Sequence, residues 1–85
     1  MDWKVIVADG ARKDLARFPA KDQAKIAITL LEMSRNPFSG DVVKLEGELG
    51  RWRRRVGSYR VFFSVNKASR IVSVSAILRR TSTTY

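Results

Sequence analysis

The sequence predicts an α+β fold: an N-terminal strand, an α-helical hairpin and then a three-stranded antiparallel meander, with both helices packed on one face of the sheet. Three observations support this. Val and Ile dominate residues 3–8, apolar residues recur at helical spacing through residues 9–35, and apolar and polar residues alternate from residue 51 to residue 78. A chain of 85 residues forms one domain, so residues 1–85 are assigned to a single unit.

The helical hairpin is indicated by apolar spacing and by two prolines. Ala11, Leu15 and Phe18 share one face of a first helix, which Asp9 can cap and which ends before Pro19. Residues 20–35 form the second helix, which stops at Asn36-Pro37. Its apolar face is expected to contain Ile26, Leu30 and Met33, widened by Ala27 and Leu31.

The second half of the chain predicts the meander. Residues 42–45 form a short extended piece, and strands are expected over residues 51–56, 59–66 and 70–78. Gly57-Ser58 fits a tight hairpin turn. Because the helices should cover one face of this sheet, the other face stays free for function.

Nearly all of the net positive charge lies in this second half. Residues 1–43 carry seven basic and six acidic residues, whereas residues 44–85 carry ten basic and two acidic residues, a net of +8. Charge concentrated in one folded unit produces a positive field, which favours polyanionic partners.

Strand alternation predicts where the basic side chains point. Arg51, Arg53 and Arg55 alternate with Trp52 and Val56, so these arginines should stand on the open face. Arg60 and Phe62 of the next strand should join them, with Arg79 or Arg80 at the end of the third strand. Arginines beside an aromatic ring suit the binding of phosphates and the stacking of bases.

Arg54 falls on the side of its strand that is predicted to be apolar. We expect it near the sheet edge, with its stem packed and its guanidinium reaching solvent. We assign it no catalytic role.

The composition excludes several kinds of chemistry. The chain has no Cys and no His, so no disulfide is possible, and a zinc site would need carboxylates alone. The usual general base at neutral pH is also missing. No signal peptide and no apolar run long enough to span a membrane is present, so a cytoplasmic protein with no cofactor and no membrane partner is expected.

Several of these segments match a family pattern. Lys44-Leu45-Glu46-Gly47, the segment Arg51–Phe63 with its Val-Gly-Ser-Tyr-Arg core, and the Arg79-Arg80 pair before Tyr85 resemble the RelE/ParE family of type II toxins. The resemblance covers nearly the whole chain, including the helical hairpin. It implies either a RelE-like, metal-independent endoribonuclease that cleaves translated messenger RNA, typically on the ribosome, or a ParE-like inhibitor of DNA gyrase. A third reading is a catalytically inactive basic nucleic-acid-binding homologue.

The resemblance also implies residue roles. In RelE-like enzymes the basic pair at the positions of Arg53 and Arg55 binds phosphate and helps to deprotonate the nucleophile, and the arginine at Arg60 stabilises charge on phosphorus. The C-terminal tyrosine, here Tyr85, stacks on a base or protonates the leaving oxygen. A basic residue at the end of the last strand, Arg79 or Arg80, completes the catalytic set. The residues expected to bind RNA around it are Lys44, Arg51, Arg80 and Phe62.

This sequence departs from its relatives at the expected base. Arginine replaces the lysine that some relatives carry in the basic pair, and it is a poor proton acceptor because its pKa exceeds about 12. Glu46 or Glu48 could supply the base, or could serve only to solvate the loop. The family further implies a cognate antitoxin, and the basic charge of this chain predicts an acidic antitoxin segment that covers the basic face.

Overall fold

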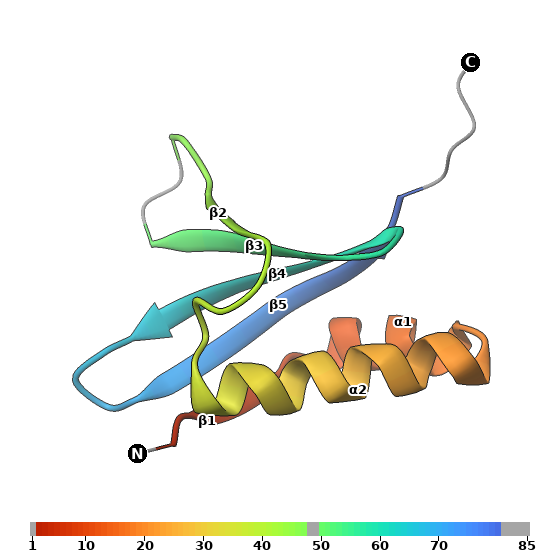
Figure 1. Ribbon diagram of the computed structural model, residues 1–85, viewed down its shortest axis with the longest axis horizontal. Helices are drawn as coiled ribbons and strands as arrows, with labels where there is room; N and C mark the ends of the chain where they lie inside the picture. The colour runs from red at the N-terminus through yellow and green to blue at the C-terminus, as the bar shows by residue number, and fades with distance from the viewer. Residues whose placement is uncertain (1, 48–49, 81–85) are drawn as a thin grey trace.

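The computed structural model describes residues 2–47 and 50–80, which form two helices and a five-stranded sheet (Figure 1). The elements, in chain order, are β1 (Lys4–Val7), α1 (Asp9–Arg17), α2 (Ala20–Arg35), β2 (Val42–Lys44), β3 (Arg51–Val56), β4 (Tyr59–Asn66) and β5 (Ile71–Arg79). The strand order in the sheet is β1-β5-β4-β3-β2. Neither described helix is long and apolar enough to cross a membrane.

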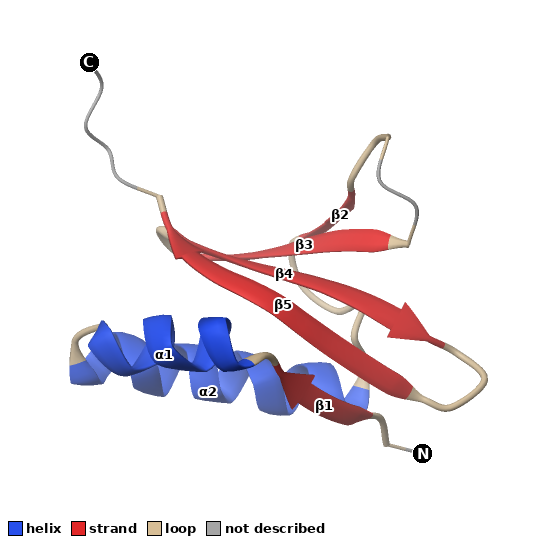
Figure 2. Ribbon diagram, turned by 180° about the vertical axis from the view of Figure 1, so that it is seen from behind, coloured by secondary structure: helices blue, strands red, loops and turns tan. Residues whose placement is uncertain are grey.

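The predicted α+β class and the helical hairpin are confirmed, and the sheet is larger than expected. The short extended piece pairs with β3 as β2, so the antiparallel meander has four strands. The N-terminal strand β1 joins the sheet in parallel beside β5, which makes the sheet mixed. Both helices lie on the same side of the sheet (Figure 2), as the apolar alternation predicted.

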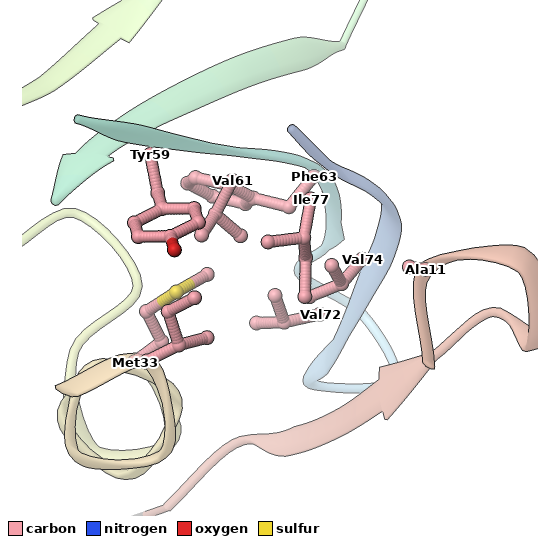
Figure 3. Packing of buried hydrophobic residues seen from close by; sticks show 9 residues of the cluster. Ala11, Met33, Tyr59, Val61, Phe63, Val72, Val74 and Ile77 are labelled. Atoms are coloured by element: carbon pink, nitrogen blue, oxygen red, sulfur yellow. The ribbon is translucent and has the colours of Figure 1, made fainter. Parts of the chain in front are cut away.

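The hydrophobic core lies between the sheet and the helices. Figure 3 shows side chains of β4 and β5 pointing toward Met33 of α2, with Ala11 of α1 at one side. The fully buried members are Ala11, Ile26, Met33, Tyr59, Val61, Phe63, Val72, Val74 and Ile77. This packing leaves the opposite side of β3, β4 and β5, here called the open face, without a covering helix or strand among the described residues.

Two details of the helices differ from expectation. Ala8, not Asp9, is the N-cap of α1, and no side chain caps it; Asp9 lies in the first turn, where its negative charge complements the helix dipole. On α2 the buried face is completed by Thr29, whose hydroxyl donates to the Lys25 carbonyl. Leu31 is 58% exposed and Ala27 is exposed as well, so the predicted widening of the apolar face is wrong.

A β-bulge in β5 changes which side chains face the core. Phe62 pairs with Ala76 whereas Phe63 pairs with Val74, so Ser75 is an extra residue in β5. Simple alternation from Val72 and Val74 would have turned residue 77 outward. The bulge instead buries Ile77, and it shifts every later residue of the strand by one position.

Candidate nucleic-acid interface

The β3–β4 hairpin places two arginines directly opposite each other. Arg55 pairs with Arg60 in the antiparallel register. The backbone N–H of Arg55 donates to the Asp41 carbonyl at 2.9 Å, on the side of β3 that faces away from β4. Arg55 and Arg60 therefore form a non-hydrogen-bonded pair, the kind in which opposite Cα atoms are closest, at about 4.5 Å.

Arg53 and Arg80 complete a group of four. Arg53 lies two residues from Arg55 on the same face of β3 and pairs with Phe62. The backbone N–H of Arg80 donates to the Ser58 carbonyl at 2.6 Å, which extends the β4–β5 pairing beyond its last registered pair. Arg80 is therefore on the face of Arg60, one step along the diagonal. We call Arg53, Arg55, Arg60 and Arg80 the arginine cluster.

The charges of the cluster act on one another. Partial burial lowers the pKa of the Arg60 guanidinium below its usual value, and the positive charges of Arg80, Arg53 and Arg55 lower it further. Asp41 acts in the opposite direction and raises the pKa of Arg60. Because the four cations oppose one another, a bound polyanion would relieve their repulsion.

Apolar side chains surround the cluster on the same face. Phe62 is partly exposed between Arg53 and β5, while Val43, opposite Arg53, is 43% exposed and Leu78, opposite Arg60, is 50% exposed. An open face that combines guanidinium groups with exposed apolar and aromatic surface can bind both phosphates and bases.

The two C-terminal arginines of β5 lie on different faces. Arg79 pairs with Tyr59, and its guanidinium lies 5.7 Å from the centroid of that ring on the helix side of the sheet. Of the Arg79/Arg80 pair it is therefore Arg80 that faces Arg60, and the placement expected of Arg79 in the catalytic set is corrected. The bulge at Ser75 is the physical reason, since without it Arg79 would have pointed to the open face.

Two further residues expected to bind RNA, Arg51 and Lys44, lie on opposite faces of the sheet. Arg51 is on the open face, and its Nη2 donates to the Ser75 hydroxyl at 3.3 Å. Lys44 pairs with Trp52, so it is exposed on the other side of the sheet from the cluster. Tyr85 and Glu48 lie outside the described residues.

Arg54 folds inward, contrary to the expectation that its guanidinium reaches solvent. The residue is 9% exposed, its Nη2 donates to Glu32 Oε1 at 2.8 Å, and its Nη1 donates to the Ser39 carbonyl at 2.8 Å. The ion pair with Glu32 ties β3 to the end of α2, and the hydrogen bond to Ser39 ties it to the loop before β2. Gly40 packs so closely that an added Cβ would lie 2.5 Å from the Arg54 Cζ.

Sequence reasoning missed Asp41, Val43 and Leu78. Asp41 and Val43 alternate along the start of β2, but a three-residue strand is too short for a clear pattern. Leu78 was hidden by the bulge, which reverses the alternation of β5 after Ser75.

Comparison with known proteins places this architecture in a family. The family model described as the ParE toxin of the type II toxin-antitoxin system, parDE, matches residues 5–83. Among curated proteins no sequence matches the chain. The chain superposes on the RelBE2 toxin-antitoxin complex of Mycobacterium tuberculosis with a TM-score of 0.84 and 24% identity, covering 94% of this chain and 100% of the other.

Two further solved structures agree. The archaeal RelE-RelB complex of Pyrococcus horikoshii has a TM-score of 0.84 at 25% identity, with 98% of this chain and 100% of the other covered. The isolated RelE toxin of E. coli has a TM-score of 0.81 at 16% identity, with 95% and 87% covered. The chain therefore belongs to the ParE toxin family of type II toxin-antitoxin systems, within the RelE/ParE group of toxins.

Proposed function

We propose that this toxin is a metal-independent endoribonuclease that cleaves translated messenger RNA on the ribosome, in the cytoplasm. The observation that carries the proposal is the arginine cluster on the open face beside Phe62. Cleavage proceeds by attack of a ribose 2′-hydroxyl on the adjacent phosphodiester, which gives a 2′,3′-cyclic phosphate and a free 5′-hydroxyl.

The cluster offers a role for each member. Arg60 is closest to the centre, flanked by Arg55 across the hairpin and by Arg80 along the diagonal, so it is best placed to stabilise the charge that develops on phosphorus. Arg53 and Arg55, which lie two residues apart on the same face of β3, hold the phosphate through charge-assisted hydrogen bonds from their guanidinium groups. Phe62 offers a ring on which a base stacks.

The test is induced expression in bacteria, followed by primer extension on several translated messages. Wild type should arrest growth and produce new cuts inside reading frames, and Arg60→Ala should abolish the cuts. Lys67→Ala, which removes an exposed cation in the turn after β4, is the matched control and should cut like wild type. Tyr85→Ala in the same assay tests whether the C-terminal tyrosine takes part in the chemistry.

One observation favours a second function, inhibition of DNA gyrase. The matching family model is that of ParE toxins, and α2 presents Ile28 and Leu31, exposed by 59% and 58%, on a surface that a protein could cover. Growth arrest with intact messages, together with loss of supercoiling by purified gyrase, would support this reading over the nuclease.

An acidic antitoxin is the proposed partner. Of the solved structures above, that from Pyrococcus horikoshii is a RelE-RelB complex and that from Mycobacterium tuberculosis is a RelBE2 toxin-antitoxin complex. The net charge of +9 and the arginine cluster favour an acidic segment of the cognate antitoxin across the open face, where it would compete with RNA.

A further inference from the structure

A carboxylate lies in line with the arginine cluster. Asp41 directly precedes β2, and its carbonyl oxygen accepts the hydrogen bond from the Arg55 N–H. Since Val42 pairs with Arg54, the register places Asp41 opposite Arg55 and on the same face of the sheet. Asp41, Arg55 and Arg60 thus follow one another across three neighbouring strands, and the negative charge of Asp41 acts on Arg60.

The other described carboxylates are engaged or lie elsewhere. Asp22 accepts a hydrogen bond from Tyr59, and Glu32 is paired with Arg54. Asp9 and Asp14 belong to α1, on the far side of the sheet, and Asp2 precedes β1 at the distant edge.

Glu46, the base considered from the sequence, is five residues from Asp41. The Leu45 N–H donates to the Arg51 carbonyl at 3.0 Å, and Glu46 follows in the turn beyond the end of β2. It therefore lies at the opposite end of β2 from the Arg55–Arg60 pair.

The backbone around Asp41 is held on both sides. Arg54 donates to the Ser39 carbonyl and packs against Gly40, and the Val42 N–H donates to the Gly40 carbonyl at 3.1 Å. The Arg55 N–H then fixes Asp41 itself. Arg54 therefore helps to fix the backbone just before Asp41, as a group that acts on a substrate requires.

We propose that Asp41 is the general base of the RNA cleavage, an inference that rests on the proposed endoribonuclease function. Its carboxylate takes the proton from the attacking ribose 2′-hydroxyl. The 2′-oxygen forms a bond to phosphorus as the bond from phosphorus to the 5′-oxygen breaks. The leaving 5′-oxygen takes a proton from water, and Asp41 returns its proton to the hydroxide that remains, so the protein is regenerated.

A carboxylate provides the proton acceptor that the arginines cannot provide. An arginine guanidinium stays protonated at neutral pH, so the cluster can bind and stabilise anions but accepts no proton. Asp41 supplies a proton acceptor next to those cations, on the same face of the sheet, and such an acceptor is what general base catalysis needs.

The test measures single-turnover cleavage of a defined message on programmed ribosomes at its mapped cut site. Asp41→Asn keeps the size of the side chain and removes the proton acceptor. We expect the cleavage rate to fall by about 100-fold or more, the usual contribution of a general base. Binding to a message with a 2′-deoxyribose at the cut site should be unchanged or tighter, because one negative charge has left the open face. Asp2→Asn makes the same change at an exposed carboxylate before β1, at the distant edge of the sheet, and is the matched control that should cut at the wild-type rate.

The pH profile separates a base from a residue that only shapes the site. The wild-type rate should fall at acid pH as the carboxylate takes up a proton, and Asp41→Asn should lose this acid limb. If the wild-type cleavage rate shows no fall at acid pH, the proposal is overturned whether or not the variant folds. It is also overturned if Asp41→Asn cleaves at the wild-type rate, or if its loss of cleavage is fully explained by an equal loss of message binding. If wild type itself cuts no message, the nuclease function fails and Asp41 has no such role.

Discussion

Arg55 and Arg60 stand directly opposite each other across the β3–β4 hairpin, in a non-hydrogen-bonded pair. Like charges in this position destabilise a sheet, yet both side chains are near two further arginines. The hairpin thus holds an arrangement that is unfavourable in the free protein and that an anion would stabilise. This is the pattern expected of a binding site whose ligand completes its charge balance.

The first prediction concerns the stability of the free protein. Arg55→Gln keeps a polar, unbranched side chain at an exposed position and removes one of the opposed charges. We expect the free energy of unfolding to rise by about 0.5 kcal/mol at low salt, because the repulsion across the hairpin is lost. Urea unfolding measures this change in unfolding free energy. Added phosphate should narrow the difference between the two proteins, because it should stabilise wild type more than Arg55→Gln.

Lys67→Gln is the control, since it removes one positive charge from a turn outside the cluster. If the unfolding free energy rises equally in both variants, the lower net charge is responsible and not the loss of the Arg55–Arg60 pair.

The second prediction concerns Gly40. Its φ of +79° favours glycine, and a Cβ there would meet the Arg54 guanidinium at 2.5 Å. Gly40→Ala should therefore cost more stability than the 1 kcal/mol or so expected from backbone strain alone. Gly47→Ala is closely matched, with φ of +76° but with no atom of residues 2–47 or 50–80 that the added Cβ would meet within 4 Å. Equal losses of unfolding free energy in the two variants would show that the Arg54 contact contributes nothing.

The third prediction concerns the ion pair between Glu32 and Arg54. Glu32→Gln weakens a charge-assisted hydrogen bond to a buried guanidinium, but Glu32 is 52% exposed, so water compensates in part. We expect a loss of about 1 kcal/mol in unfolding free energy. In an Arg54→Met background the same substitution should cost almost nothing. If Glu32→Gln lowered the unfolding free energy by the same amount in the Arg54→Met background, the loss would come from the role of Glu32 within α2 and not from its ion pair with Arg54.

Much of this architecture could be predicted from the sequence, and the exceptions have local causes. The bounds of α2 follow from Pro19 and from Asn36-Pro37, and the β3–β4 hairpin follows from Gly57-Ser58 and alternation, so Arg53, Arg55, Arg60 and Phe62 were correctly placed on the open face. Arg79 and Arg80 could not be separated, because one extra residue at Ser75 reverses the faces of β5 and has no sequence signature of its own.

The positions of Arg54 and Asp41 could not be predicted from the local sequence pattern, because both depend on residues that are distant in the chain. Arg54 was expected to reach solvent because its partners, Glu32 and the Ser39 carbonyl, are 22 and 15 residues away in the chain. The position of Asp41 depends on the register of β2 against β3, which neither segment specifies alone.

The fourth prediction uses Tyr59, whose hydroxyl donates to Asp22 at 2.7 Å. Burial raises the pKa of Tyr59 above its ordinary value, and Asp22 raises it further, while Arg79 lowers it. The folded protein thus holds this proton more tightly than the unfolded chain. The associated stability is fully present below the pKa of an unfolded tyrosine, about 10, and is lost as the pH rises through the higher folded value.

Urea unfolding between pH 8 and 11 tests this sign. Tyr59→Phe should be less stable than wild type at pH 8, where the hydrogen bond to Asp22 is intact, and the difference in unfolding free energy should narrow as the pH rises. Tyr85→Phe removes the other tyrosine hydroxyl of the chain and serves as the control. If the difference in stability between wild type and Tyr59→Phe widened toward pH 11, it would contradict a raised pKa for Tyr59 in the folded protein.

The last prediction concerns the antitoxin. If an acidic segment covers the open face, the opposite charges of the two proteins steer their encounter, and the association rate should fall steeply with added salt. Stopped-flow mixing of the toxin with its cognate antitoxin at several salt concentrations measures the dependence. Arg60→Gln should flatten the salt dependence more than Lys67→Gln, because both remove one charge but only Arg60 lies within the arginine cluster. An association rate that does not change with salt would place the antitoxin on an uncharged surface, such as the exposed apolar side of α2 around Ile28 and Leu31.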